Sequence, residues 1–143
     1  MEKACAQADE RSSGRWMGAW LPVVAYMALI FYFSSLSHPE ENLPKFFFET
    51  LGDKLLHAIE YAVLGGLCYR AFRRAGGPLA AEYAVLLAIM ATSLYGATDE
   101  VHQVYVPLRT AAWSDWLADT VGAVIGVVGY RRVVEYGVKD GFS

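Results

Sequence analysis

Charged residues are scarce in this chain of 143 residues, and only two cysteines occur. The charged residues make up 19% of the sequence, whereas a soluble domain averages about a quarter. The net charge is −3 and no basic stripe is present to neutralise phosphates, which argues against a nucleic-acid-binding protein. Cys5 and Cys68 lie far apart, without CxxC or Cys/His spacing, so neither a structural disulfide nor a structural zinc site is expected.

The short motifs of the best-known enzyme sites are missing as well. The sequence contains no GxSxG nucleophile elbow, no HExxH pair and no phosphate-binding P-loop. No internal repeat stands out, and the length allows one domain. Function must therefore be sought in how the polar residues are distributed among the hydrophobic ones, which make up 55% of the chain.

Long uncharged segments are what the sequence does contain, and they predict helices that cross a membrane. Residues 16–33 carry no charge, and a helix of about 20 residues crosses a hydrocarbon core about 30 Å thick. A cleaved signal peptide is the alternative for this segment, but its apolar region would be only about 7–15 residues long and followed by small residues. Residues 83–97 are also uncharged, and residues 116–130 carry a single charge.

The second predicted span is the least apolar, because residues 55–72 include His57 and Glu60. Three neighbours of membrane length favour a fourth span here, since backbone in lipid must be helical. We therefore predict an all-α fold, an integral membrane four-helix bundle. Its spans cover approximately residues 16–35, 54–72, 80–98 and 114–131. They form one transmembrane domain of residues 16–132, between an N-terminal tail of residues 1–15 and a C-terminal tail of residues 133–143.

The distribution of Lys and Arg predicts how these spans are oriented. Nine of the 12 lie in the two tails, in the connection between the second and third spans, or at the span ends that adjoin them, and the other three are Lys45, Lys54 and Arg109. Because cytoplasmic segments are enriched in Lys and Arg, both termini are predicted to be cytoplasmic. The first and third connections then face outward. In the first, loop 37–50, the triplet Phe46–Phe48 is either an aromatic anchor in the membrane interface or a lid.

Ionisable and polar residues collect at the predicted outer ends of the second and third spans. Asp53, His57 and Tyr61 are spaced by four and share one helical face, and Asp99 and Gln103 are one turn apart. The full set at these two ends is Asp53, Lys54, His57, Glu60, Tyr61, Asp99, Glu100, His102 and Gln103.

The fourth span carries two aspartates on the face that bears its glycines. Asp115, Asp119, Gly122 and Gly126 lie on one side of a helix. Small residues at GxxxG spacing allow helices to approach closely, so this face is predicted to pack inward. Arg109 lies in the loop before this span, and we expect it close to the same residues.

Several of these residues also have a purely structural interpretation. Asp53 and Asp115 could complement the N-termini of their helices, and Lys54 could extend to the membrane interface. Arg109 could clamp Asp115 to Glu100. The glycine stripe could serve packing alone.

The chemistry that such a set permits is broad. Glu100 could act as a general base, and His57 could carry a proton or orient a carboxylate. Arg109 and Lys54 could hold a phosphate or pyrophosphate. Several carboxylates with a histidine could also bind a divalent cation. The residues alone leave these options open.

Taken in order, these residues resemble the VanZ-like family over about residues 36–130. Leu108 departs from the family pattern because glycine is frequent at its position, and Asp119 departs because asparagine is common there. The matching motifs are Asp53-Lys54-x-x-His57 with Tyr61 and Gly65, Asp99-Glu100-x-x-Gln103, Pro107-x-Arg109, and Asp115 with Asp119, Gly122 and Gly126.

The resemblance implies a small multi-pass protein of the bacterial cell membrane and, for some members, a link to resistance against lipoglycopeptides such as teicoplanin. It does not supply a reaction. As an enzyme, the chain would act at the outer leaflet on a lipid-linked or anionic cell-envelope ligand, by hydrolysis or transfer. The catalytic candidates are then Glu100, His57, Asp115 and Asp119, and the ligand-binding candidates are Asp53, Lys54, Tyr61, Asp99, Gln103 and Arg109. As a non-catalytic binding module or scaffold, the same cluster would bind a head group, an envelope precursor or a lipoglycopeptide, or would fix helix packing.

Overall fold

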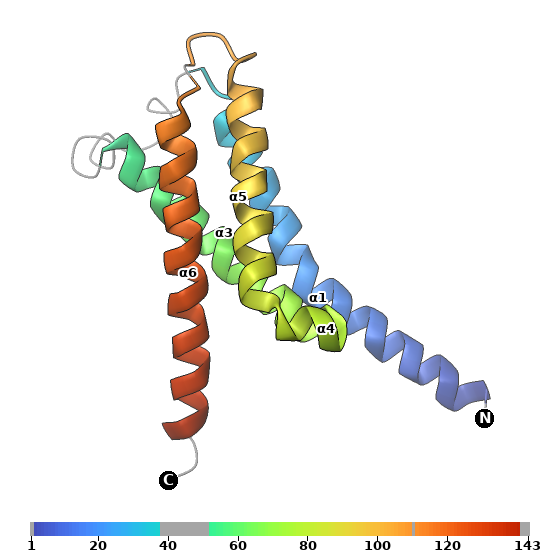
Figure 1. The fold of residues 1–143 in the computed structure, drawn as a ribbon. Coiled ribbons are helices and arrows are strands. Elements are labelled where there is room, and N and C mark those ends of the chain that lie inside the picture. Colours follow the sequence, from blue (N-terminus) through green and yellow to red (C-terminus); the bar gives the residue numbers. More distant parts are fainter. Residues whose placement is uncertain (1, 38–51, 110, 141–143) are drawn as a thin grey trace.

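The chain is all-helical over the residues that the structure describes (Figure 1). The computed structural model describes residues 2–37, 52–109 and 111–140. No strand occurs within these ranges, which confirms the all-α prediction. The helices are α1 (Glu2–Ser34), α3 (Asp53–Ala75), α4 (Gly77–Glu82), α5 (Ala84–Gln103) and α6 (Trp113–Asp140).

Two helical segments are long and apolar enough to cross a membrane. They are Ser13–Ser34 within α1 and the whole of α5, Ala84–Gln103. Within the described ranges, the same criteria do not select α3 or α6. Both of these helices carry charged residues near each end. In α3, for example, charged residues occur within 53–60 and again within 70–74. The predicted N-terminal tail is itself largely helical, because α1 begins at Glu2.

The connection between α3 and α5 contains the short helix α4 instead of a plain loop. The amide N–H of Gly76 bonds to the Phe72 carbonyl at 3.2 Å and ends α3. Gly77, the first residue of α4, has a φ of +78°, a conformation that glycine accepts readily, and Pro78 follows it in the first turn. As a result, α5 begins at Ala84 and runs through Gln103, so the polar residues from Asp99 onward lie inside its last turns.

The helices are arranged so that four helix ends meet at one end of the molecule. In Figure 1, the Ser34 end of α1, the Asp53 end of α3, the Gln103 end of α5 and the Trp113 end of α6 gather at the top. The opposite ends of α1 and α6 point downward, on the side where α4 lies. The residues predicted to form a site come from the upper ends, so the fold brings them to the same region.

Helices α3 and α6 pack with almost no side chain between their backbones. A Cβ atom added at Gly122 would overlap the Ala58 carbonyl oxygen, and one added at Gly126 would overlap the Ala62 carbonyl oxygen. These contacts confirm that the face of α6 with Asp115, Asp119 and the glycines packs inward. Close backbone approach through small residues is the usual packing of helices in lipid.

Large apolar side chains cover the outside of the helices. Leu21 of α1, Leu94 of α5 and Ile125 of α6 are each more than 60% exposed, and many others are about half exposed. So many exposed large apolar side chains are unusual for a soluble monomer and indicate surface that contacts lipid or another protein.

Part of the predicted first loop cannot be compared with the structure. Residues 38–51 lie outside the described residues, and so do Lys45 and the Phe46–Phe48 triplet. The alternatives of anchor and lid for that triplet therefore stay predictions.

Candidate functional site

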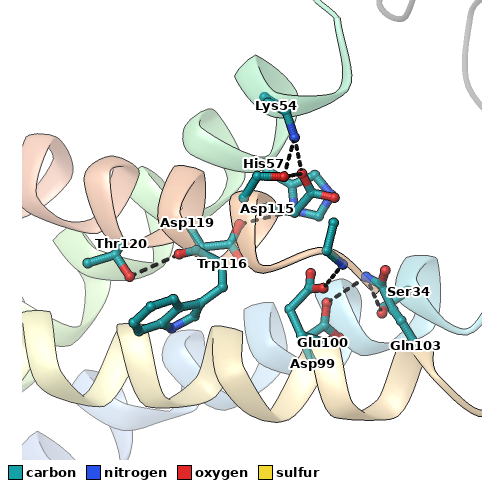
Figure 2. A network of polar contacts seen from close by, with 12 residues as sticks. Ser34, Lys54, His57, Asp99, Glu100, Gln103, Asp115, Trp116, Asp119 and Thr120 are labelled. Atoms are coloured by element: carbon teal, nitrogen blue, oxygen red, sulfur yellow. Dashed lines mark hydrogen bonds and ion pairs between the residues drawn. The ribbon is translucent and has the colours of Figure 1, made fainter. Parts of the chain in front are cut away.

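Polar side chains from α1, α3, α5 and α6 meet where the four helix ends gather, as Figure 2 shows. They form three hydrogen-bonded groups. The first centres on His57 and Asp119, the second on Asp99 and Gln103, and the third on Lys54 and Asp115.

The innermost group joins α3 to α6. His57 Nδ1 lies 3.0 Å from Asp119 Oδ1, and the two side chains are 12% and 0% exposed. Asp119 Oδ2 has no hydrogen-bond partner among the described residues. Gly122 places this pair, because its contact with Ala58 brings the α6 backbone against α3 directly beside His57.

Glu100 approaches the same pair from α5. Its Oε2 accepts a hydrogen bond of 2.8 Å from the Ala112 backbone N–H, just before α6 begins. Its Oε1 is shielded from solvent and has no partner in the described part of the chain. The ligand atoms of His57, Glu100 and Asp119 all lie within 4.8 Å of one another. We call these three residues the central trio.

The second group links α5 to α1. Gln103 Nε2 donates to Asp99 Oδ2 at 3.1 Å, one helical turn away, and to Ser34 Oγ at 3.2 Å. Asp99 is buried, and its Oδ1 finds no partner among the residues described. The predicted one-turn pair of Asp99 and Gln103 is thus present, and Gln103 also bonds to the end of the first span.

The third group lies at the rim of the site. Lys54 Nζ contacts Asp115 Oδ1 at 2.5 Å and Ser114 Oγ at 2.7 Å. The Lys54 side chain is 62% exposed, whereas that of Asp115 is 11% exposed. Asp115 also lies in the first turn of α6, where a carboxylate complements the helix dipole. Its structural and charge-pairing interpretations therefore both apply.

Arg109 is presented by a strained turn. The preceding residue, Leu108, has a φ of +67° although it is not glycine, and the Arg109 N–H bonds to the Val106 carbonyl at 3.2 Å. The resemblance implies glycine at this position, and the conformation here is one that glycine favours. No ion pair between Arg109 and Asp115 or Glu100 occurs within the described residues, so the structure does not bear out the clamp. The Arg109 Nε is buried and has no hydrogen-bond partner among the described residues.

Three further candidates lie around these groups. Tyr61 is fully buried one turn along α3 from His57, with its ring centroid 6.3 Å from that of Tyr95. Asp53 is the first residue of α3, whose N-cap is Gly52, and its side chain is outside the described part. His102 lies apart from the central trio, where it contacts Ser35 Oγ at 3.0 Å.

Some residues of the site were not predicted. Ser34 and Ser114 supply hydroxyl partners, and the Ala112 amide holds Glu100. Ser114 could have been suspected from its place beside Asp115 at a helix start, where serine is common. The contact between Ser34 and Gln103 spans 69 residues, and nothing in the local sequence marks it.

The arrangement can hold a cation, move a proton or bind an anion. Two carboxylates and an imidazole form a donor set that divalent cations use, and the same groups serve as acids and bases. Lys54 at the rim and Arg109 in the adjoining turn supply positive charge for an anionic ligand. The fold and site together define an all-helical protein with two helical segments long and apolar enough to cross a membrane and a polar site at one end of its helices.

The comparisons with known proteins agree with that class. The sequence model of the VanZ/LLP1 family matches residues 11–134. The chain therefore belongs to the VanZ family. Among curated proteins and among solved structures, no match is found.

Proposed function

We propose that α1, α3, α5 and α6 all cross the membrane, with both termini in the cytoplasm. The 23 residues of α3 and the 20 of α5 give helices about 35 and 30 Å long, enough to span the hydrocarbon core. The ends of α1 and α6 that lead to the termini lie on the side of the arginine-bearing α3–α4 connection (Figure 1). The positive-inside rule puts that side in the cytoplasm and the polar site at the outer face.

Cysteine labelling in intact cells tests this orientation. Leu108 and Leu79 are 77% and 71% exposed and lie in the α5–α6 turn and in α4 respectively. In a variant without Cys5 and Cys68, Leu108→Cys should react with a membrane-impermeant maleimide. Leu79→Cys should react only after the cells are permeabilised. The opposite pattern would invert the proposed topology.

We further propose that the site acts on an anionic, lipid-linked cell-envelope ligand at the outer leaflet. The observation that carries this proposal is the convergence of His57, Glu100 and Asp119 within 4.8 Å, in a membrane protein with positive side chains beside them. Lys54, exposed at the rim, can meet a phosphate head group as it enters. The exposed apolar faces of the helices leave the lipid chain in the bilayer while its head group reaches the site.

The reaction that these groups suit is hydrolysis of a phosphate ester or anhydride. Glu100 takes a proton from water, and the water oxygen bonds to phosphorus. The bond from phosphorus to the leaving oxygen breaks, and that oxygen takes a proton from a charged His57. Asp119 holds the imidazole by the 3.0 Å contact and stabilises its charged form, and Asp115 keeps Lys54 in place at the rim. Transfer differs only in that a hydroxyl of an acceptor replaces water.

Turnover of a polyprenyl pyrophosphate in proteoliposomes tests the enzyme proposal. Glu100→Gln keeps the size of the side chain and can still accept the Ala112 N–H, but it cannot act as a base. It should release phosphate at least about a hundredfold more slowly than wild type, with binding of the lipid retained. Ser35→Ala, at the same end of the molecule, is the matched control and should turn over normally. Undiminished turnover by Glu100→Gln would remove Glu100 from the mechanism.

A binding module without turnover is the second candidate, and the exposed Lys54 at the rim favours it as much as the first. In that case wild type binds the pyrophosphate lipid and releases no phosphate. Arg109→Ala should weaken lipid binding under either proposal, and unchanged affinity would show that Arg109 does not hold the head group. The sensitivity of expressing cells to teicoplanin is a separate readout for the resistance link that the resemblance suggests.

A further inference from the structure

The central trio is arranged as the ligands of a metal ion would be. His57, Glu100 and Asp119 come from three different helices, yet their ligand atoms lie within 4.8 Å of one another. Two ligands about 2.1 Å from one ion and at right angles are about 3.0 Å apart. The separation of His57 Nδ1 and Asp119 Oδ1 is 3.0 Å. Ligands on opposite sides of an ion are about 4.2 Å apart. The ligand atoms of the trio, at most 4.8 Å apart, would therefore need to move by less than about 1 Å to bind one ion.

Unpartnered carboxylate oxygens at the trio independently point to a ligand. Asp119 is 0% exposed, and its Oδ2 has no hydrogen-bond partner within the described ranges. Glu100 Oε1 and the neighbouring Asp99 Oδ1 are also buried and have no hydrogen-bond partner within these ranges. Buried polar atoms are nearly always partnered, and a cation would satisfy carboxylate oxygens that have no partner.

The charge balance favours a cation over an additional neutral donor. Glu60, Asp99 and Asp119 are electrostatic neighbours, with Arg109 and His57 close enough to act on the same group. Glu100 adds a fourth carboxylate. Four carboxylates against one guanidinium and one imidazole leave an excess of negative charge in a site sheltered from water, where unpaired charge is costly. The cation at the rim, Lys54, is in contact with Asp115.

The surroundings hold the trio in place before any ion binds. The close contacts of Gly122 and Gly126 with α3 set the position of Asp119 relative to His57. The Ala112 N–H holds one Glu100 oxygen and leaves the other for coordination. Such support of the ligands by neighbouring groups is typical of metal sites.

We propose that His57, Glu100 and Asp119 bind one divalent transition-metal cation, of the class of Mn²⁺ or Zn²⁺. One imidazole with two carboxylates suits these ions better than Ca²⁺ or Mg²⁺, which take oxygen ligands. Three protein ligands leave positions on the ion for water or for a phosphate oxygen. A bound ion would be held by these three side chains and would lower the pKa of a water bound to it. In that state Glu100 would be a ligand and not the base, and His57 would be a neutral ligand and not the acid. The proposal does not depend on turnover, because a protein can bind a cation without a reaction.

Mn²⁺ binding to the chelator-treated full-length protein in detergent tests this site. Electron paramagnetic resonance measures bound Mn²⁺ from the loss of the free-ion signal, and nitrogen hyperfine coupling detects an imidazole ligand. Wild type should bind about one Mn²⁺ per chain with nitrogen coupling. The proposal is overturned if wild type does not bind Mn²⁺ stoichiometrically, or if it binds Mn²⁺ without nitrogen coupling. This test uses wild type alone, so it does not depend on the folding of a variant.

A matched pair of histidine variants assigns the imidazole. His57→Gln should lose the nitrogen coupling and weaken Mn²⁺ binding at least about tenfold. His102→Gln, at the same end of the molecule but bonded to Ser35, should retain both. The reverse result overturns the assignment, as does equal binding by both variants. Turnover at the full rate after chelation would overturn the role of the ion but not the proposed reaction. Mn²⁺ binding without any turnover would overturn the proposed reaction but not the metal site.

Discussion

Replacing Gly126 by alanine tests whether the close contact of α3 and α6 builds the site. The added methyl group would overlap the Ala62 carbonyl oxygen, a backbone atom that cannot rotate away as a flexible side chain could. Overpacking of a tight interface costs typically about 1–3 kcal/mol, and overlap with three backbone atoms of Ala62 places this case near 3 kcal/mol. A loss of that size lowers the folding equilibrium constant roughly a hundredfold.

The assay is thermal unfolding of the purified protein in detergent. For a chain of this size, about 3 kcal/mol corresponds to a fall in Tm of roughly 10 °C. Gly129→Ala is the matched control, because it lies one turn along the same helix and a Cβ there meets nothing within 4 Å. It should leave Tm within about 1–2 °C of wild type. If the two variants unfold at the same temperature, the glycine contact does not hold α6 against α3.

The same contact has a consequence for the site. Gly122 touches Ala58, which adjoins His57, so Gly122→Ala should push His57 away from Asp119 as well as lower Tm. Mn²⁺ affinity should fall in this variant and stay unchanged in Gly129→Ala. Normal affinity in a destabilised Gly122→Ala protein would separate the packing of the helices from the geometry of the site.

Three smaller changes test individual contacts by their effect on Tm. Leu108→Gly should leave Tm unchanged or raise it slightly. Relief of the positive φ is worth about 1–2 kcal/mol, which offsets the cost of glycine in the unfolded chain, about 0.5–1 kcal/mol, and the Leu108 side chain is exposed. A fall in Tm of several degrees would refute the strain. Trp116→Phe removes the 3.0 Å bond from the indole N–H to the Ser93 carbonyl and should cost about 0.5–1.5 kcal/mol, so an unchanged Tm would mean that the bond is replaced. Lys54→Ala breaks the rim pair with Asp115 and should cost less than about 1 kcal/mol, with a dependence on salt, because the lysine is largely exposed; a loss that is large and independent of salt would mean that the pair is buried.

The sequence alone was sufficient to predict an all-helical fold and the inward face of α6. The uncharged runs predicted α1 and α5, since length and hydropathy are local properties of a segment. The spacing of Asp119, Gly122 and Gly126 predicted that this face of α6 packs inward, because a period of 3.6 residues places them together whatever the partner is. The pairing of Asp99 with Gln103 followed from the same period.

Boundaries were less predictable where the chain changes direction. Pro78 with its two preceding glycines signalled a break, but the sequence did not reveal that α4 would occupy the start of the third predicted span. The positive φ of Leu108 was also hidden, because leucine does not mark a left-handed turn as glycine does.

Only the tertiary structure decided which polar residues meet. Helical periodicity shows which way a side chain faces but not how far one helix slides along another. That register depends on the glycine backbone of α6 resting on the carbonyl oxygens of α3. This contact brings Asp119 to His57 and leaves Asp115 to Lys54 at the rim. The sequence could offer the candidates for a site, whereas the packing of three helices selected His57, Glu100 and Asp119 as its centre.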